Sequence, residues 1–356
     1  MVETKPIQLI EFIVNLEARN YSDKDWELLV RQARTTGLLS RLDYLLTESG
    51  LVIPEHVKQH LNSANKFWKS QKRILDWELH NLKGVFNYLD LPLILLKGTA
   101  YSAANLRAGF GRVFSDIDIL VPEQSLNNVT ELLRLHGWFP EALDNYDKRY
   151  YTQWMHELPP FRHLKTGTTL DVHHNILPRT CKLSPDSKEL LKKAVYIPNK
   201  GFWTLSAEDM VLHSATHLFW GGEFDNAFRD LSDLDLLLRE FSSQNDNFWN
   251  SLLIRAEQVG LREPVFYALN YTYEILGTPL PQNVLDDLRA VAKPRLTALF
   301  FKTALLPYHS SCNTFWTEIS RWCLYVRSHW LKMPWYLLLP HLSRKTWMRL
   351  TSKEKQ

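Results

Sequence analysis

The stretches LILLKGT (residues 93–99) and SDIDILV (residues 115–121) decide the fold of this chain. The first begins with a short apolar run (93–96) that is bounded by Lys97 and Gly98, a pattern typical of a buried strand that leads directly into a helix. The second largely alternates polar and apolar residues, which predicts a strand with one polar face. A further strand with the sequence TTLDVH (residues 168–173) carries Asp171. Together these segments predict a small mixed β-sheet.

Three aspartates fall on the predicted strands. Asp116 and Asp118 are two residues apart, so their carboxylates project from the same face of one strand. Carboxylates held side by side repel each other unless a cation lies between them. Magnesium prefers oxygen ligands and shares them with substrate phosphates, and a third carboxylate from Asp171 permits two ions about 3.5–4 Å apart. The pattern therefore predicts that these three aspartates bind Mg²⁺ (or Mn²⁺) for an in-line phosphoryl or nucleotidyl displacement.

A phosphate-binding turn is expected beside these carboxylates. Gly98 lets the backbone approach a ligand closely, and the N–H groups at the start of a helix hold anionic oxygens. The hydroxyl of Thr99 adds one more donor. Lys97 and Arg112 carry positive charge that balances the charge of a polyphosphate. We therefore expect Lys97, Gly98, Thr99 and Arg112 to bind a triphosphate.

In this order, the motifs resemble the nucleotidyltransferase superfamily with the polymerase-β-like core. More closely, the chain is similar to a branch of bacterial, largely uncharacterised nucleotidyltransferase-like proteins with an LKG…R…DIDLLV…DLH pattern. The resemblance covers about residues 91–240, because a helical segment of the LHxxxH…W…RDLxDL type follows. The chain departs from the usual superfamily pattern in having Thr99 in place of a serine and a longer gap before the aspartate pair. The matching residues are residues 95–99, Arg112, residues 115–121, residues 170–173, Leu212, His213, His217, Trp220 and residues 229–234.

The resemblance implies an α+β fold, with a small mixed β-sheet nucleotidyltransferase core flanked by N-terminal and C-terminal helical regions. It implies that Gly98 and Thr99 hold the triphosphate of a nucleotide. It also implies that Asp116 and Asp118 bind both metal ions, and that Asp171 completes one metal site and assists deprotonation of the acceptor. The implied reaction moves a nucleoside monophosphate from a nucleoside triphosphate such as ATP to a hydroxyl acceptor, with release of pyrophosphate. No motif indicates the acceptor or the preferred base.

The chain divides into four predicted regions. An N-terminal helical region (1–90) precedes the nucleotidyltransferase-like α/β core (91–200), because apolar residues recur at helical spacing before residue 90. A helical domain that closes the cleft (201–292) and a basic, aromatic-rich C-terminal helical segment (293–356) follow. The predicted strands span 93–96, 115–121, 161–164 and 168–173. The predicted helices after the core span about 207–220, 227–241, 247–259 and 263–276.

Two histidines one helical turn apart, His213 and His217, support a different interpretation. Their spacing suits zinc with Asp230 or Asp233 nearby, although the glutamate of an HExxH motif is absent. A zinc-dependent hydrolase is therefore one alternative function, against the plainer expectation of histidines packed inside a helix bundle. Another alternative is a catalytically inactive nucleotide-binding or interaction module with the same fold. The candidates to line the cleft are His173, His217, Arg229 and Asp230.

Residues 293–356 combine positive charge with tryptophan. They carry 11 Lys and Arg against 2 acidic residues, a net charge of +9, whereas the other 292 residues carry −6. Aromatic rings among cations suit an anionic membrane surface or nucleic acid, and the plainer expectation is a helical subdomain with tryptophans in its core. Pro334 and Pro340 argue against one uninterrupted helix there. The segment holds 5 of the 13 tryptophans: Trp316, Trp322, Trp330, Trp335 and Trp347.

The composition excludes several classes of protein. With 356 residues, 45% hydrophobic and 23% charged, the chain has the balance of a globular protein of two or three domains. Three scattered cysteines argue against a disulfide scaffold and against thiolate zinc sites. Neither a signal peptide nor an apolar run near the ~20 residues of a spanning helix is found. We therefore expect a cytoplasmic protein, either free or peripheral at the inner membrane surface; the oligomeric state is not indicated.

Overall fold

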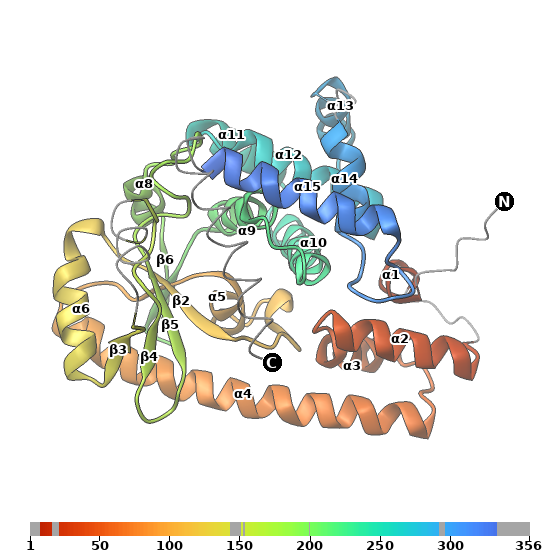
Figure 1. The fold of residues 1–356 in the computed structure, drawn as a ribbon, viewed down its shortest axis with the longest axis horizontal. Coiled ribbons are helices and arrows are strands. Elements are labelled where there is room, and N and C mark those ends of the chain that lie inside the picture. The colour runs from red at the N-terminus through yellow and green to blue at the C-terminus, as the bar shows by residue number, and fades with distance from the viewer. Residues whose placement is uncertain are drawn as a thin grey trace, which may run out of the picture.

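A mixed sheet of seven strands lies at one side of the chain (Figure 1). The computed structural model describes residues 8–15, 21–142, 151, 154–198, 200–291 and 296–332. The strands are β1 (Ile94–Leu95), β2 (Asp116–Leu120), β3 (Trp138–Pro140), β4 (Phe161–His163), β5 (Thr169–His173), β6 (Val195–Ile197) and β7 (Phe202–Thr204). Their order in the sheet is β3-β4-β5-β2-β1-β7-β6.

The centre of the sheet mixes parallel and antiparallel pairs. Strand β2 pairs antiparallel with β1 and parallel with β5, and β1 pairs parallel with β7. The outer pairs β3–β4, β4–β5 and β6–β7 are antiparallel. One face of β2 and β5 is apolar and fully buried, through Ile117, Ile119, Leu170 and Val172. The opposite face of these two central strands is therefore left for polar side chains.

The described residues before β1 are mostly helical. Helix α2 begins with a capping box, in which the Ser22 hydroxyl accepts from the Asp25 backbone N–H and the Asp25 carboxylate accepts from the Ser22 backbone N–H. Helix α4 starts after Pro54 and runs beneath α3 toward the sheet (Figure 1). The helices are α1 (Gln8–Val14), α2 (Asp23–Thr35), α3 (Leu39–Ser49) and α4 (Glu55–Tyr88).

Short helices connect the strands, and a bundle of longer helices follows them. The connecting helices are α5 (Lys97–Ala103), α6 (Leu126–Leu135) and α8 (Ser187–Lys192), with 3₁₀ turns at Arg107–Gly109 and Glu123–Ser125. The bundle comprises α9 (Ala207–Gly221), α10 (Ala227–Gln244), α11 (Phe248–Gln258), α12 (Arg262–Leu276), α13 (Gln282–Val291), α14 (Leu296–Ala304) and α15 (Phe315–Lys332). Helix α9 packs against α10, α11, α12 and α15, so it is the central helix of this bundle.

The predicted α+β class is confirmed, and so are the four predicted strands and the four predicted helices of the bundle. Strands β3, β6 and β7 were not predicted from the sequence. Each is three residues long, too short for an alternating pattern to emerge, and β6 is mostly exposed. Strand β7 owes its place to parallel pairing with β1, a partner more than a hundred residues away along the chain.

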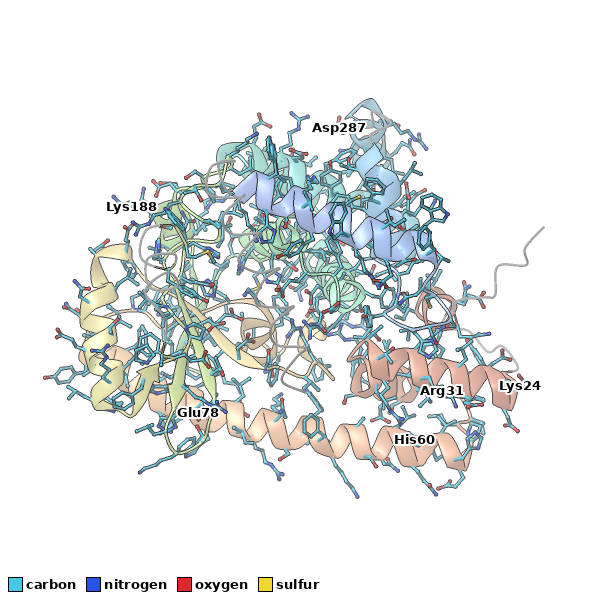
Figure 2. The ribbon with its side chains drawn as sticks, viewed as in Figure 1. Lys24, Arg31, His60, Glu78, Lys188 and Asp287 are labelled. Atoms are coloured by element: carbon cyan, nitrogen blue, oxygen red, sulfur yellow. The ribbon has the colours of Figure 1, made fainter. Side chains whose placement is uncertain are left out.

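Helix α4 is joined to the sheet through a buried carboxylate. Glu78 is fully buried, and its Oε1 accepts hydrogen bonds from the hydroxyls of Thr166 and Thr168 at the turn between β4 and β5. His163 Nδ1 lies 3.7 Å from the same oxygen. Figure 2 shows Glu78 on α4 beside this hairpin. The long helix therefore helps to fix the position of the β4–β5 turn, which precedes Asp171 on β5.

Buried ion pairs join three separate regions. Asp233 on α10 lies between two arginines, with its Oδ1 2.7 Å from Arg41 Nη2 and its Oδ2 2.6 Å from Arg112 Nε. Arg41 belongs to α3 and also donates to the hydroxyl of Ser232. Burial opposes ionisation of Asp233, but the two guanidinium groups outweigh it and lower the pKa of that carboxyl. The N-terminal helices, the loop before β2 and α10 therefore meet at one carboxylate.

Helix α15 corrects the expectation that the C-terminal tryptophans fill a core. The side chains of Trp316, Trp322 and Trp330 are 67%, 66% and 54% exposed. The helix packs through its other face, where small and polar residues such as Ser328 allow close approach to Gly222 at the end of α9. Trp335, Trp347 and the two prolines lie outside the described residues, and the anionic partner of this region stays a prediction. No helix within the described ranges has the length and apolar character needed to cross a bilayer.

Replacing Asp233 by asparagine tests the buried ion pairs. Removing one partner leaves two buried guanidinium groups without their charge partner, so we expect the free energy of unfolding at pH 7 to fall by about 3–5 kcal/mol. Because the folded-state pKa of Asp233 is lowered, its contribution is complete above the unfolded pKa and is lost as the pH falls through the folded pKa. The free energy of unfolding, measured by urea denaturation, should therefore differ less between wild type and Asp233→Asn below pH 4 than at pH 7.

The exposed acid Asp225 precedes the same helix and provides the matched control. Asp225→Asn should change the free energy of unfolding by no more than about 0.5 kcal/mol. Equal effects of the two substitutions would contradict a structural role for the ion pairs.

Candidate functional site

The pairing of β2 with β5 brings two of the predicted aspartates side by side. Asp118 and Asp171 are direct partners in the parallel register, and Asp116 is paired with Thr169. Because side chains alternate along a strand, all three aspartates leave the sheet on the same face. One carboxylate oxygen each from Asp118 and Asp171 and one ring nitrogen of His173 lie within 4.8 Å of one another. Asp116 is outside this group and its carboxylate accepts from the hydroxyl of Ser115, at 3.0 Å.

Asp118 contacts two side-chain nitrogens. It is 3% exposed, and its Oδ1 lies 2.6 Å from Lys97 Nζ and 2.9 Å from His173 Nε2. Burial opposes ionisation of this carboxyl, but Lys97 and His173 outweigh burial and lower its pKa strongly. Burial likewise acts to lower the pKa of Lys97, and the charges of Asp118 and Glu157 more than reverse it, so this pKa is raised. Asp118 and Lys97 therefore form a charged pair at neutral pH.

Asp171 is a carboxylate without a counter-charge in contact among the described residues. Its Oδ1 is buried, and no described residue forms a hydrogen bond with it. Burial, followed by the negative charges of Asp118 and Glu157, raises the pKa of Asp171 to about 7. An acidic oxygen held next to other carboxylates and left unpartnered is the arrangement that a divalent cation stabilises. The donor set of Asp118 and Asp171 therefore fits a cation that prefers oxygen ligands.

The turn after β1 has an unusual backbone and little free space. Lys97 has φ of 48°, in the left-handed region, where a residue other than glycine costs of the order of 1–3 kcal/mol. Gly98 follows because a Cβ at that position would overlap the guanidinium of Arg112. Thr99 is buried, and its hydroxyl donates to the backbone carbonyl of Asp116 at 3.4 Å. Both residues thus have packing roles within the protein itself. Their predicted contacts with a triphosphate stay predictions.

The guanidinium of Arg112, which lies against Gly98, also contacts a cluster of polar side chains on α10. Its Nη2 lies 3.7 Å from Asp230 Oδ1, and Arg229 Nη2 lies 3.0 Å from the same oxygen. His217 Nδ1 on α9 is 3.9 Å from Asp230 Oδ2, and the His217 side chain is 47% exposed. Three of the four residues expected to line the cleft therefore meet at Asp230, next to Arg112. The fourth, His173, contacts Asp118.

The two histidines considered for zinc, His213 and His217, differ in how exposed their side chains are. His213 is 3% exposed, and burial followed by the charge of Lys97 lowers its pKa to about 3. Among the described residues, two groups of ligand atoms lie close enough to share an ion: Asp118, Asp171 and His173, and His156, Glu157 and His173. Neither group contains His213 or His217. The geometry therefore gives no support to a zinc hydrolase built on that pair.

Two residues of the site were not predicted from the sequence. Glu157 forms an isolated antiparallel bridge with His173, and its carboxylate Oε2 lies 3.2 Å from His173 Nδ1. His156 precedes it, and its ring centroid is 5.4 Å from that of His173. The segment around residues 156–158 carries no motif, and only its long-range pairing with the end of β5 brings it to the site. An acidic residue next to a histidine was the one local signal available.

Comparison with known proteins agrees with the arrangement of these strands and aspartates. The family described as "Uncharacterised nucleotidyltransferase" matches residues 22–277. This range includes the N-terminal helices from α2 onward, the whole sheet and the bundle as far as the end of α12. No match was found among curated proteins or among solved structures.

Replacing Lys97 by methionine tests the charge balance at Asp118. The Lys97 ammonium competes with any cation for this carboxylate, and unit charges 4 Å apart interact by about 4 kcal/mol at an effective dielectric constant of 20. We therefore expect Lys97→Met to bind Mn²⁺ at least about tenfold more tightly than wild type in the absence of nucleotide. Electron paramagnetic resonance of free Mn²⁺ measures the affinity.

Lys165 is exposed at the turn between β4 and β5, so Lys165→Met is the control for loss of one positive charge. It should leave the Mn²⁺ affinity of the protein unchanged within about twofold, since exposed charges are screened by salt. Equal or weaker Mn²⁺ binding by a folded Lys97→Met protein would show that Asp118 is not part of a cation site.

Proposed function

Because this chain belongs to the uncharacterised nucleotidyltransferase family, we propose that it transfers a nucleoside monophosphate from a nucleoside triphosphate to a hydroxyl acceptor. The observation that carries the proposal is the register of β2 and β5, which sets Asp118 beside Asp171 on the polar face of the sheet. Lys97 and Arg112 stand at the turn next to these carboxylates, where an anionic substrate needs counter-charge.

Divalent cations fit the carboxylate group. Asp118 and Asp171 offer oxygen ligands, the unpartnered Oδ1 of Asp171 needs a positive partner, and Asp116 lies two residues along the same face. We propose that these three aspartates hold Mg²⁺ (or Mn²⁺). The bound ions would supply Lewis-acid stabilisation of the charge that develops on the phosphate oxygens. Magnesium is favoured over softer metals for these three residues because all of them are hard oxygen donors.

The reaction proposed is a substitution at phosphorus. The acceptor hydroxyl oxygen forms a bond to the α-phosphorus, the bond from that phosphorus to the oxygen bridging to the β-phosphate breaks, and pyrophosphate leaves. The hydroxyl proton passes to the carboxylate of Asp171. This role suits Asp171 because its carboxylate has no hydrogen bond that competes for the proton at Oδ1.

The remaining polar residues would bind the triphosphate and orient it. Arg112 is held by Asp233 and Asp230, so its guanidinium has a fixed position before substrate arrives. A group fixed in advance stabilises the charge of the transition state without reorganising. We propose that Lys97 and Arg112 neutralise the phosphates and that Gly98 and Thr99 place the backbone beside them. His217 and Arg229 are proposed to contact the nucleotide or the acceptor from the helical side.

Replacing Asp118 by asparagine tests the proposed transfer. Several kcal/mol of charge stabilisation are lost with the carboxylate, and each 1.4 kcal/mol is a factor of ten in rate. We expect the transfer of label from an α-³²P nucleoside triphosphate to a molecule in host lysate, with Mg²⁺ present, to fall about 100-fold or more.

Asp225→Asn is the control, since Asp225 is exposed and outside the site. It should keep the rate of the wild-type protein. Wild-type label transfer by a folded Asp118→Asn protein would overturn the proposal. Magnesium-independent nucleotide binding by the wild-type protein without release of pyrophosphate would instead assign the chain to the inactive nucleotide-binding modules.

A further inference from the structure

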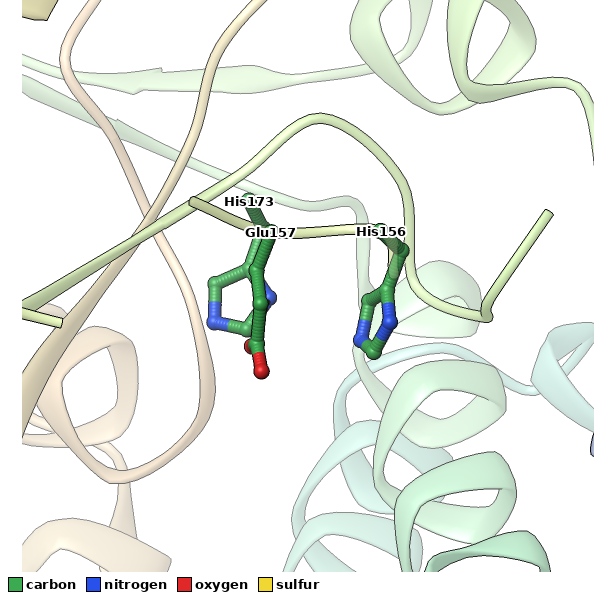
Figure 3. Close-up of side chains that lie close together, drawn as sticks. All are labelled: His156, Glu157 and His173. Carbon is green, nitrogen blue, oxygen red and sulfur yellow. Dashed lines mark ion pairs between the residues drawn. The ribbon is translucent and has the colours of Figure 1, made fainter. Parts of the chain in front are cut away.

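A second group of ligand atoms lies beside the aspartates, on the side of β5 that faces the segment around residue 157. One ligand atom each from His156, Glu157 and His173 lies within 4.8 Å of the other two (Figure 3). The backbone holds these residues together, because Glu157 is the bridge partner of His173 and the carbonyl of His156 accepts from the N–H of His174 at 2.8 Å. The group therefore does not depend on flexible side chains alone.

The ring of His173 lies between the carboxylates of Asp118 and Glu157. Its Nε2 lies 2.9 Å from Asp118 Oδ1, and an ionised carboxylate only accepts, so Nε2 carries the proton. In a neutral imidazole the lone pair is then on Nδ1. This Nδ1 has no hydrogen-bond partner within the described part of the chain although His173 is 2% exposed, and the carboxylate Oε2 of Glu157 is 3.2 Å away. A buried lone pair that faces a carboxylate is stabilised by a cation between the two.

Hydrogen bonding of a ligating histidine to a carboxylate through its other nitrogen is a recurrent feature of metal sites in proteins. Asp118 has this role toward His173. The hydrogen bond fixes both the tautomer and the direction of the ring, so Nδ1 is directed to one place before any ion binds. Asp118 Oδ1 therefore contacts both Lys97 and His173, so Asp118 is adjacent to both groups of ligand atoms.

His156 supplies the second imidazole of the group. Its Nδ1 is buried, and none of the residues that the structure describes forms a hydrogen bond with it. Burial disfavours the protonated ring and lowers the pKa of His156. A histidine must be neutral to bind a metal ion.

We propose that His156, Glu157 and His173 form a binding site for a divalent transition-metal ion, with zinc as the first choice. Two imidazoles and one carboxylate are a common zinc donor set, whereas magnesium prefers oxygen ligands throughout. A tetrahedral zinc ion holds its ligands about 3.4 Å apart, given bond lengths of about 2.0–2.1 Å. The ligand atoms lie within 4.8 Å of one another, farther apart than around a bound ion. Because His156 and Glu157 are only partly buried, their side chains have room to move closer together. Three protein ligands leave a fourth position for water or a phosphate oxygen.

This site contains none of the three aspartates, although it shares His173 with the group of Asp118 and Asp171, and it does not rest on the proposed transfer. Its ligands are mostly nitrogen, and metal binding to them is measured without nucleotide or acceptor. Loss of transfer activity with intact zinc binding, or the reverse, would therefore separate the two proposals experimentally.

The test is a titration of the purified, chelator-treated full chain with Co²⁺ and with Zn²⁺. The visible spectrum of Co²⁺ reports nitrogen and oxygen coordination, and competition with Zn²⁺ gives the zinc affinity. We expect one equivalent of Zn²⁺ to bind, and the variants His156→Gln and Glu157→Gln to lose about 100-fold in affinity. His136→Gln and Glu141→Gln, at exposed positions, are the matched controls and should bind as the wild type does.

X-ray absorption at the zinc edge identifies the ligands even where a variant is destabilised. Two imidazoles should be seen in wild type and one in His156→Gln protein loaded with excess zinc. The inference is overturned if wild type binds no zinc, or if both variants bind zinc as tightly as wild type. It is also overturned if zinc binding survives in both variants and is lost in Asp171→Asn, since the ion would then belong to the aspartates.

Discussion

The in-register parallel pairing of β2 with β5 is the constraint on which the candidate site depends. It makes Asp118 and Asp171 direct neighbours, and it sets His173 two residues further along the same face. A slip of one residue would turn Asp171 toward the hydrophobic core and expose its apolar neighbours. Burial of Leu170 and Val172 on the opposite face opposes that slip. The apolar side of the sheet therefore determines the geometry of the polar side, although it contributes no chemical group to it.

A second constraint comes from the helices rather than from the sheet. Arg41 and Arg112 share the buried carboxylate of Asp233, so the turn beside the aspartates is fixed from α3 and from α10 at once. Buried ion pairs often add little net stability compared with apolar packing of the same volume. The cluster instead determines the position of the Arg112 guanidinium. This guanidinium lies against Gly98, where a side chain would overlap it. The N-terminal helices and the bundle are in this way part of the site.

Local patterns in the sequence were sufficient to predict the centre of the fold. The apolar run at 93–96 and the alternation at 115–121 predicted β1 and β2, and the spacing of Asp116 and Asp118 placed both on one face. These features depend on periods of a few residues, which the sequence displays directly. The family match over residues 22–277 also shows that the relationship extends further toward the N-terminus than the motifs between 91 and 240 indicated.

Features that depend on distant pairing were not predicted. His156 and Glu157 reach the site through pairing with the end of β5, and no local period marks that partnership. The helical spacing of His213 and His217 suggested a shared metal, but burial separates their environments. The tryptophans on α15 are exposed because the helix packs through its opposite face, where Ser328 lies against Gly222. That packing depends on the neighbouring helix and not on a pattern within α15.

Helix α4 has a mechanical consequence for the whole molecule. Its 34 residues correspond to a rod about 51 Å long, with its first half against α3 and Glu78 in its second half bonded to the β4–β5 turn. A rod of this length converts a tilt of a few degrees at one end into a displacement of a few ångströms at the other. Helix α4 therefore connects the N-terminal helices physically to the turn that precedes the third aspartate on β5.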